Sequence, residues 1–281
     1  MEYTAYINLT TKEVKLKKTP TIVLRKFLGS RGYAAKILYD NVGPEVEPLS
    51  ENNLLIFSPG LLTGTPWPTG ARYTVTAKSP LTGAYGYSNS SGHFGPELRK
   101  AGFAALVFEG KSEKPVYLKI EDENIEIKDA DKYWGKNALE TERLLKEEYE
   151  GAKVASIGQG GENLVKISSV INDGGRAAAR CGLGAVMGFK KLKAVVVNTN
   201  KEVGLSSEFK EKAKEKMRKA ATHPGSKSLR KWGTVELVDP KNQSGDLPTR
   251  NHLSGQFEHA DKVNAKALDE YVYQNTGCYS C

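Results

Sequence analysis

A run of glycines and small polar residues, Gly86 to Gly95, constrains the fold of this chain more than any other feature. The run reads GYSNSSGHFG, which is too polar for a hydrophobic core and too interrupted for a helix or strand, so we expect a loop. Glycine has no Cβ and tolerates positive φ, so such a loop lets the backbone approach a ligand closely. Basic residues flank the run and indicate an anionic ligand: Arg72, Lys78, Arg99 and Lys100.

Strand-like segments dominate the first two hundred residues. Alternating or continuous apolar patterns predict strands and two hairpins, at residues 3–9, 13–17, 54–57, 72–77, 116–120, 124–128, 153–157, 165–171 and 193–198. Helical patterns at 21–28 and 33–39 and a capping box from Asn137 to Glu140 add a few helices. We therefore expect an α+β fold whose β-rich, two-sheet, sandwich-like domain occupies residues 1–203.

The composition changes after residue 203. Phe209, Ala213 and Met217 recur at helical spacing behind a Ser206-Ser207 cap, and residues 265–274 also have a helical pattern. Two helices bury little core by themselves. We therefore expect residues 204–281 to be the truncated start of a mostly helical domain.

The overall composition is that of a soluble globular protein, with 39% hydrophobic and 26% charged residues. No apolar run reaches the length of a membrane span and no signal peptide is evident, so we expect a cytoplasmic protein without a membrane partner. The net charge of +8 comes from 41 basic and 33 acidic residues. Because no recognition motif accompanies the charge, we expect solvated helix faces and no nucleic acid, with an acidic partner protein as the alternative.

Two segments have the residues of an anion site. Arg72 has the bidentate geometry that phosphate needs, and Ser88 to Gly95 offers backbone groups and the Asn89 side chain. A plain surface loop is the alternative. In residues 172–188, Arg176 and Arg180 precede a glycine-rich approach to a short helix, a plausible anion cradle. Close helix–sheet packing that requires glycine is the alternative there.

The cysteines suggest a metal or redox site at the carboxyl end. Cys278 and Cys281 form C-x-x-C, which is typical of half a zinc or iron–sulfur site or of a redox dithiol. A four-ligand site needs two more ligands, and the four histidines offer no suitable spacing. Cys181 stands alone and is expected to be a small buried residue.

An ordered series of short motifs resembles the amino-terminal domain of the tungsten-containing aldehyde ferredoxin oxidoreductases. The matching motifs are Pro68-Thr69-Gly70, Arg72-Tyr73, Lys78-Ser79-Pro80-Leu81-Thr82-Gly83, Asn89-Ser90, Phe94-Gly95 and Glu97-Leu98. The resemblance extends from the first strand to the last residue. It implies a tungstopterin cofactor, in which two pterins bind tungsten or molybdenum and a magnesium ion bridges their phosphates.

The resemblance also implies roles for particular residues. Arg72 and Arg176 would contact the pterin phosphates, and Asn89 and Ala177 would give backbone oxygens to magnesium. The residues implied to pack on the cofactor are Ser90, Ser91, Gly92 and Arg180, and those implied to bind a [4Fe–4S] cluster are Cys278 and Cys281. Ser91 departs from the family, which often has glycine there. The remaining cluster ligands of the family have no counterpart in this sequence.

The function implied is that of the amino-terminal part of an aldehyde:ferredoxin oxidoreductase, which converts an aldehyde and water to a carboxylic acid and passes electrons through the cluster to ferredoxin. Family members are often homodimers, and we expect this part alone to be inactive without the missing C-terminal part or subunit. No catalytic residue is assigned. The alternatives are a short, non-catalytic pterin-binding carrier subunit of a split enzyme, and a structural dithiol or zinc protein.

Overall fold

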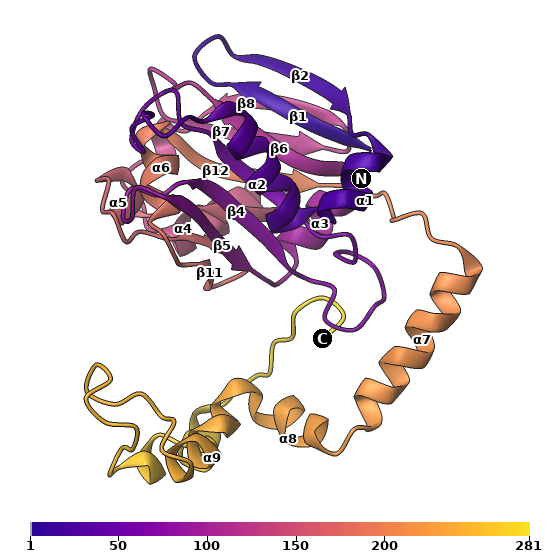
Figure 1. The fold of residues 1–281 in the computed structure, drawn as a ribbon, viewed down its shortest axis with the longest axis vertical. Coiled ribbons are helices and arrows are strands. Elements are labelled where there is room, and N and C mark those ends of the chain that lie inside the picture. Colours follow the sequence, from indigo (N-terminus) through magenta and orange to yellow (C-terminus); the bar gives the residue numbers. More distant parts are fainter. Residues whose placement is uncertain (1) are drawn as a thin grey trace. The chain divides into compact units, whose positions relative to one another are not determined.

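The computed structural model describes residues 2–281, and it divides the chain into two compact units. The first unit comprises Met1–Leu205 together with Cys278–Cys281, and the second comprises Ser206–Gly277. The last four residues therefore pack with the first unit, although the second unit separates them from it in sequence. Figure 1 shows the sheets of the first unit and the helices of the second.

The described part of the first unit contains two six-stranded sheets, ordered β2-β1-β6-β3-β4-β5 and β11-β10-β9-β12-β7-β8. The strands are β1 (Tyr3–Asn8), β2 (Glu13–Lys18), β3 (Leu55–Pro59), β4 (Tyr73–Lys78), β5 (Tyr85–Ser90), β6 (Phe103–Glu109), β7 (Val116–Glu121), β8 (Asn124–Asp129), β9 (Lys153–Ser156), β10 (Val170–Asn172), β11 (Arg176–Ala178) and β12 (Leu192–Asn198). The helices are α1 (Thr21–Phe27), α2 (Ser30–Asn41), α3 (Phe94–Lys100), η1 (Asp131–Tyr133), α4 (Ala138–Glu148), α5 (Gln159–Glu162) and α6 (Leu183–Phe189).

The period of two along the strands explains the layers. In β6, Leu106 and Phe108 face the shared core between the sheets, whereas Val107 faces the outer layer formed by α2. In β12, Val195 enters the shared core and Val196 packs with the α4 layer. Both faces of the central strands are therefore covered, which agrees with their continuous apolar sequences. The predicted two-sheet α+β fold is confirmed.

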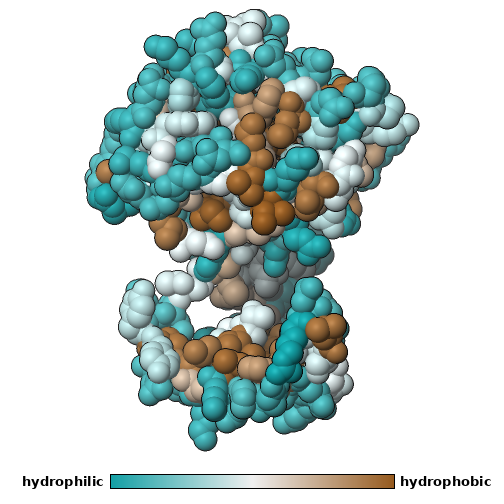
Figure 2. Space-filling model, turned by 90° about the vertical axis from the view of Figure 1, so that its left-hand side faces the viewer, coloured by the Kyte–Doolittle hydropathy of each residue, from teal (hydrophilic) through white to brown (hydrophobic). Residues whose placement is uncertain are grey.

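The described part of the second unit consists of one 16-residue helix, α7, and several short helices, with little core. Its helices are α7 (Ser207–Thr222), α8 (Gly225–Trp232), η2 (Gly233–Leu237), α9 (Val238–Gln243), η3 (Ala260–Lys262), α10 (Ala265–Leu268) and η4 (Asp269–Tyr271). The Ser206 hydroxyl accepts the Phe209 N–H at 3.2 Å and caps α7. Hydrophobic side chains reach the surface of this unit (Figure 2), for example Leu253, which is 86% exposed. Among residues 2–281, no helix combines the length and apolar character needed to cross a membrane.

The run from Gly86 to Gly95 differs from the predicted loop. Its first half lies in the edge strand β5, and its last residues begin α3. Ser88 and Ser90 are buried, whereas Asn89 between them is exposed. Small polar side chains suit this strand because their inward hydroxyls find polar partners on the neighbouring sheet, which the sequence pattern alone does not reveal.

Two other expected elements are shorter than predicted. The strand expected at residues 165–171 is confined to β10, because the preceding residues turn, with Ser168 N–H donating to Val165 O at 2.8 Å. The helix expected at residues 265–274 ends after α10 and η4. The side chains of Tyr271, Val272 and Tyr273 are exposed, so little packing supports a longer helix.

Candidate cofactor site

The edge strands of the two sheets, β5 and β11, contact each other (Figure 1). Residues 85–90 and 176–178 thereby become neighbours although about ninety positions separate them in sequence. An edge strand leaves a row of backbone N–H and C=O groups outside the sheet ladder. We call this paired edge, formed by β5, β11 and the residues that follow each strand, the β5–β11 edge.

Arg72 and Asn89 lie together on the exposed side of this edge. Arg72 directly precedes β4, and the register of β4 and β5 places Thr74 opposite Asn89. The Arg72 Nη1 donates a hydrogen bond to Asn89 Oδ1, and both side chains are exposed. A guanidinium carries five N–H donors, so this bond leaves capacity to bind an anion.

A buried asparagine, Asn172 at the end of β10, joins the two sheets. Its Oδ1 accepts hydrogen bonds from the Tyr73 hydroxyl at 3.0 Å and the Ser90 hydroxyl at 2.7 Å. Its Nδ2 donates to Ser91 O at 2.8 Å and to Asp173 Oδ2 at 2.7 Å. Burial raises the pKa of Tyr73, and the negative charge of Asp173 adds to the effect, so the tyrosine remains a hydroxyl donor. These contacts fix the end of β5 against β10.

Gly92 allows the chain after β5 to pass close to Asp173. The Asp173 carboxylate accepts the N–H groups of His93 at 2.7 Å and Phe94 at 3.1 Å, where α3 begins. Gly92 has φ of 99°, and a Cβ there would overlap Asp173 Oδ2 and lie 2.9 Å from Arg176 Cδ. Glycine is therefore required by both backbone conformation and space.

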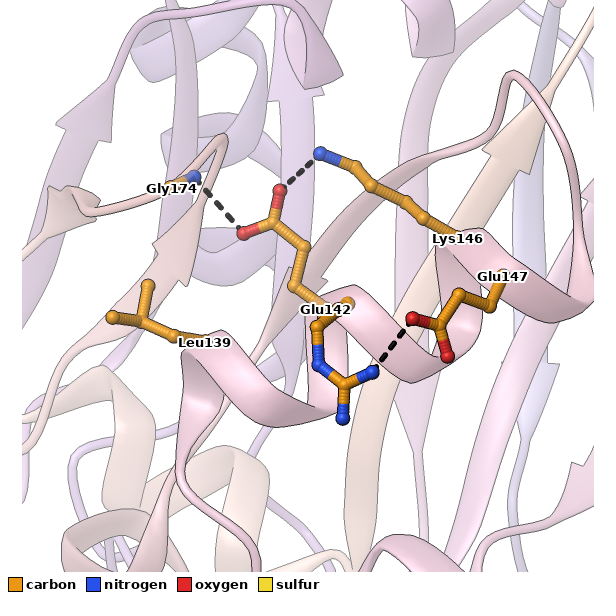
Figure 3. A pocket seen from close by; sticks show the side chains of 6 residues that line it. Leu139, Glu142, Lys146, Glu147 and Gly174 are labelled. Carbon is orange, nitrogen blue, oxygen red and sulfur yellow. Dashed lines mark hydrogen bonds and ion pairs between the residues drawn. The ribbon is translucent and has the colours of Figure 1, made fainter.

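The turn between β10 and β11 is held from the other side by a buried glutamate on α4. Asp173, Gly174 and Gly175 have φ of 47°, 73° and 129°. Figure 3 shows the Glu142 carboxylate between them and the helix: one oxygen accepts the Gly174 N–H at 3.0 Å and the other pairs with Lys146. The turn that leads into Arg176 is thus fixed by carboxylates on two sides.

The pocket drawn in Figure 3 lies beside this contact, and two ion pairs occupy the charged groups that line it. Glu142 pairs with Lys146, and Arg143 pairs with Glu147 at 2.6 Å. The charged side chains that line the pocket are thus two basic and two acidic residues that pair with one another. The pocket is consequently a less suitable site than the β5–β11 edge.

The remaining predicted residues of this region lie on or after β11. Arg176 pairs with Asn172 and Ala177 with Ile171 in the antiparallel ladder, and both are half-buried. The exposed Arg180 donates its backbone N–H to the Ser88 hydroxyl at 3.0 Å. The structure therefore brings all eight predicted cofactor residues to adjoining segments, although the Ser90 side chain points inward to Asn172.

The cysteine segment, Cys278–Cys281, also packs against this region. Tyr279 N–H donates to Gly92 O at 3.2 Å, and Thr69 N–H donates to Ser280 O at 2.7 Å. Cys281 N–H donates to Cys278 O at 3.1 Å, which closes a turn between the two thiols. Among the described residues 2–281, no three His, Cys, Asp or Glu side chains are grouped as metal ligands. The segment thus places two thiols, those of Cys278 and Cys281, beside the residues that follow β5.

Sequence reasoning missed several residues that shape the site. Arg31, on α2, donates to the Tyr87 hydroxyl at 3.0 Å and lies 5.0 Å from the centre of its ring. Tyr87 and Asn89 are alternate residues of one strand, so they share a face of β5. If Gly86 to Ser90 had been recognised as a strand, its alternation would have shown that Tyr87 and Asn89 share a face. The contacts of Asn172 and Glu142 depend on tertiary structure.

Comparison with known proteins identifies the family. The family model "Aldehyde ferredoxin oxidoreductase, N-terminal domain" matches residues 4–199, and the model for "domains 2 & 3" of the same family matches residues 211–281. The chain belongs to the aldehyde ferredoxin oxidoreductase family. The resemblance inferred from the motifs is therefore confirmed.

Several relatives of this aldehyde ferredoxin oxidoreductase family member are much longer. The tungsten-containing aldehyde ferredoxin oxidoreductases of Thermococcus kodakarensis and Pyrococcus furiosus are 46% and 45% identical over 281 residues, which cover 98% of this chain and 46% of each relative. The chain thus spans about half the length of these curated relatives. An "aliphatic sulfonate oxidoreductase, WOR-like subunit" of Pyrococcus furiosus is 37% identical over 207 residues, which cover 68% of this chain and 33% of that protein.

A solved structure has the same fold. The active-site complex BamBC of benzoyl-coenzyme A reductase, in complex with 1,5-dienoyl-CoA, matches with a TM-score of 0.84 and 32% sequence identity. The match covers 100% of this chain and 45% of that chain. The fold is therefore found in proteins named for different substrates.

Proposed function

We propose that this chain is the cofactor-binding, amino-terminal part of an aldehyde:ferredoxin oxidoreductase that uses a tungstopterin cofactor. One observation carries the proposal: β5, whose Asn89 is hydrogen-bonded to Arg72, contacts β11, which contains Arg176 and Ala177. Membership of the family supplies the cofactor class. That the substrate is an aldehyde is likewise part of the proposal.

The residues of the β5–β11 edge fit a phosphate-bearing pterin. The guanidinium groups of Arg72 and Arg176 are suited to phosphate because they donate parallel N–H groups and stay charged. Asn89 and Ala177 come from edge strands, whose backbone oxygens are partly outside the ladder and are hard ligands of the kind that magnesium prefers. We assign Ser91, Gly92 and Arg180 to the same surface. The Ser90 side chain points inward and fixes this part of β5 through its hydrogen bond to Asn172.

The cysteine segment fits an iron–sulfur cluster in ligand type. Thiolates are the usual ligands of such clusters, and Cys278 and Cys281 supply two of the four that a [4Fe–4S] cluster needs. The segment is bonded to Gly92, three residues after Asn89. The proposed pterin and cluster sites therefore share one stretch of chain, which favours electron transfer between them.

The proposed reaction joins an aldehyde and water to give a carboxylic acid, two protons and two electrons. When bound, the metal and pterins would supply the two-electron redox chemistry, and a cluster held by Cys278 and Cys281 would supply one-electron transfer to ferredoxin. The residues of this chain bind and orient the phosphates and hold the cysteine segment. We further propose a cytoplasmic enzyme that forms homodimers.

Metal and pterin content of the holoprotein that contains this chain tests the proposal. We expect tungsten or molybdenum, pterin and magnesium in the wild type and a loss of at least half of the pterin in Arg72→Ala combined with Arg176→Ala. Arg143→Ala is the control, because Arg143 pairs with Glu147 on α4 and is exposed. A wild-type holoprotein without pterin, or a double variant with full pterin and metal, would contradict the proposal.

Aldehyde-dependent dye reduction by the intact native polypeptide separates the enzyme from the carrier-subunit alternative. We expect reduction by the complete holoprotein. Bound pterin without reduction, in a polypeptide whose intact mass is near the 30.7 kDa of this sequence, would instead favour the carrier.

A further inference from the structure

The Ser91 side chain lies against one of the two cysteine sulfurs. Its Oγ is 3.2 Å from Cys278 Sγ, and both residues are half-buried. We propose that the Ser91 hydroxyl donates a hydrogen bond to Cys278 Sγ and so raises the reduction potential of the iron–sulfur cluster held by Cys278 and Cys281. This inference rests on the proposed function, in which these cysteines bind a cluster.

Backbone contacts on both sides keep this pair together. The Ser91 carbonyl accepts the Asn172 Nδ2 hydrogen bond at 2.8 Å, which fixes the residue at the end of β5. On the cysteine side, Tyr279 N–H donates to Gly92 O, and the Tyr279 hydroxyl donates to Gly64 O at 3.1 Å. The position of Cys278 relative to Ser91 is therefore set by these three hydrogen bonds as well and does not depend on the Ser91 hydroxyl alone.

The direction of the hydrogen bond follows from the chemistry of a cluster ligand. A cysteine that binds iron is a thiolate and has no proton to give, so the serine hydroxyl must be the donor. Reduction adds negative charge to the cluster and its sulfurs, and a donor aimed at a sulfur stabilises that charge. Hydrogen bonds to cluster sulfurs are among the factors that set the potential.

The neighbouring serine of the cysteine segment provides a matched control. The Ser280 hydroxyl donates to Thr65 O at 3.1 Å and thus contacts a carbonyl oxygen. Removal of either hydroxyl deletes one buried or half-buried hydrogen bond in the same region. Only the Ser91 bond involves a cysteine sulfur.

An EPR-monitored redox titration of the holoprotein tests the inference. We expect Ser91→Ala and Ser91→Gly to lower the midpoint potential of the cluster, whereas Ser91→Thr, which keeps the hydroxyl, and Ser280→Ala leave it unchanged. Resonance Raman spectra supply a second measurement: exchange into D₂O should shift an iron–cysteine stretching band in the wild type, and Ser91→Ala should lose this shift.

The outcomes separate this inference from the proposed function. If Ser91→Ala and Ser91→Gly contain full iron and sulfide but keep the wild-type potential, the inference is wrong and the cluster assignment stands. A Ser91→Thr potential as low as that of Ser91→Ala would also overturn it, because the hydroxyl would then not be the cause. A wild-type holoprotein without an iron–sulfur signal would refute the cluster assignment and this inference together.

Discussion

The two units of this chain bury very different amounts of apolar surface. In the first unit, side chains from both sheets and from α3 and α6 form one continuous core, with further clusters under α2 and α4. In the second unit, the buried residues among those described are small: Ala213, Thr249, Ala260 and Ala265. The first unit thus has the core of an independent scaffold, whereas the described part of the second unit buries too little apolar surface to be stable by itself.

The largest difference in thermal unfolding should appear when the two units are produced separately. We expect residues 2–205 to unfold in one cooperative thermal transition, because their core is self-contained. Residues 206–277 should lose helical signal gradually, without a transition. Circular dichroism and calorimetry measure both, and a sharp heat-absorption peak from residues 206–277 would break the comparison.

The comparison of the two units becomes sharper when one hydrophobic side chain in each unit is truncated and the losses of stability are compared. Phe108 is fully buried and packs edge-on against Phe57 at 5.9 Å between ring centres. Phe108→Ala should lower the free energy of unfolding by ~3–5 kcal/mol, the usual range for an aromatic residue removed from a core. Leu253→Ala, in the second unit, should change it by less than ~0.5 kcal/mol because its side chain is already exposed. Denaturant titrations that give equal losses would contradict the contrast.

The buried hydrogen bonds at the β5–β11 edge should contribute somewhat less to the free energy of unfolding than the Phe108 side chain does. Asn172→Ala leaves the hydroxyls of Tyr73 and Ser90 without their acceptor, so we expect a loss of ~2–4 kcal/mol from the cost of unpaired buried groups. Asn124→Ala is the control, since its side-chain bond to Glu126 is exposed. Chemical denaturation that shows equal stability for both variants would mean that Asn172 does not join the sheets.

The smallest of these differences in the free energy of unfolding is expected between alanine variants of Gly92 and Gly102. Gly92 and Gly102 have nearly the same φ, 99° and 100°, but a Cβ at Gly102 would meet no atom within 4 Å. Gly102→Ala should cost ~1 kcal/mol from backbone strain, and Gly92→Ala ~1–2 kcal/mol more because its Cβ overlaps Asp173. If thermal unfolding shows the same loss for both, the close approach to Asp173 is not needed for stability.

Local features of the fold were predictable from the sequence. The first hairpin and the Asn137 cap are confirmed: β1 pairs with β2, and Asn137 Oδ1 accepts the Glu140 N–H at 2.8 Å. Both depend on residues close together in the chain. The candidate site was predictable mainly through its resemblance to a family, since Arg72 and Arg176 carry no local signal that joins them.

The parts that were not predictable depend on contacts between distant residues. The serines of β5 read as a loop because their partners are distant in sequence: Asn172 lies 82 residues from Ser90, and Arg180 lies 92 residues from Ser88. The support of Gly174 by Glu142 likewise arises only after α4 packs on the second sheet. Polar residues that are buried by such contacts have no pattern of their own in sequence.

Hydrogen–deuterium exchange, compared between the holoprotein and its cofactor-free apoprotein, most directly tests the claim that the cofactor binds at the β5–β11 edge. Each sheet has two edges, and the proposed cofactor lies at only one edge of each sheet, β5 or β11, so that β2 and β8 serve as internal controls. We predict slower exchange in residues 85–92 and 176–180 on loading, and no change in residues 13–18 and 124–129. Unchanged exchange at β5 and β11, in protein shown to have gained pterin and metal, would contradict the account.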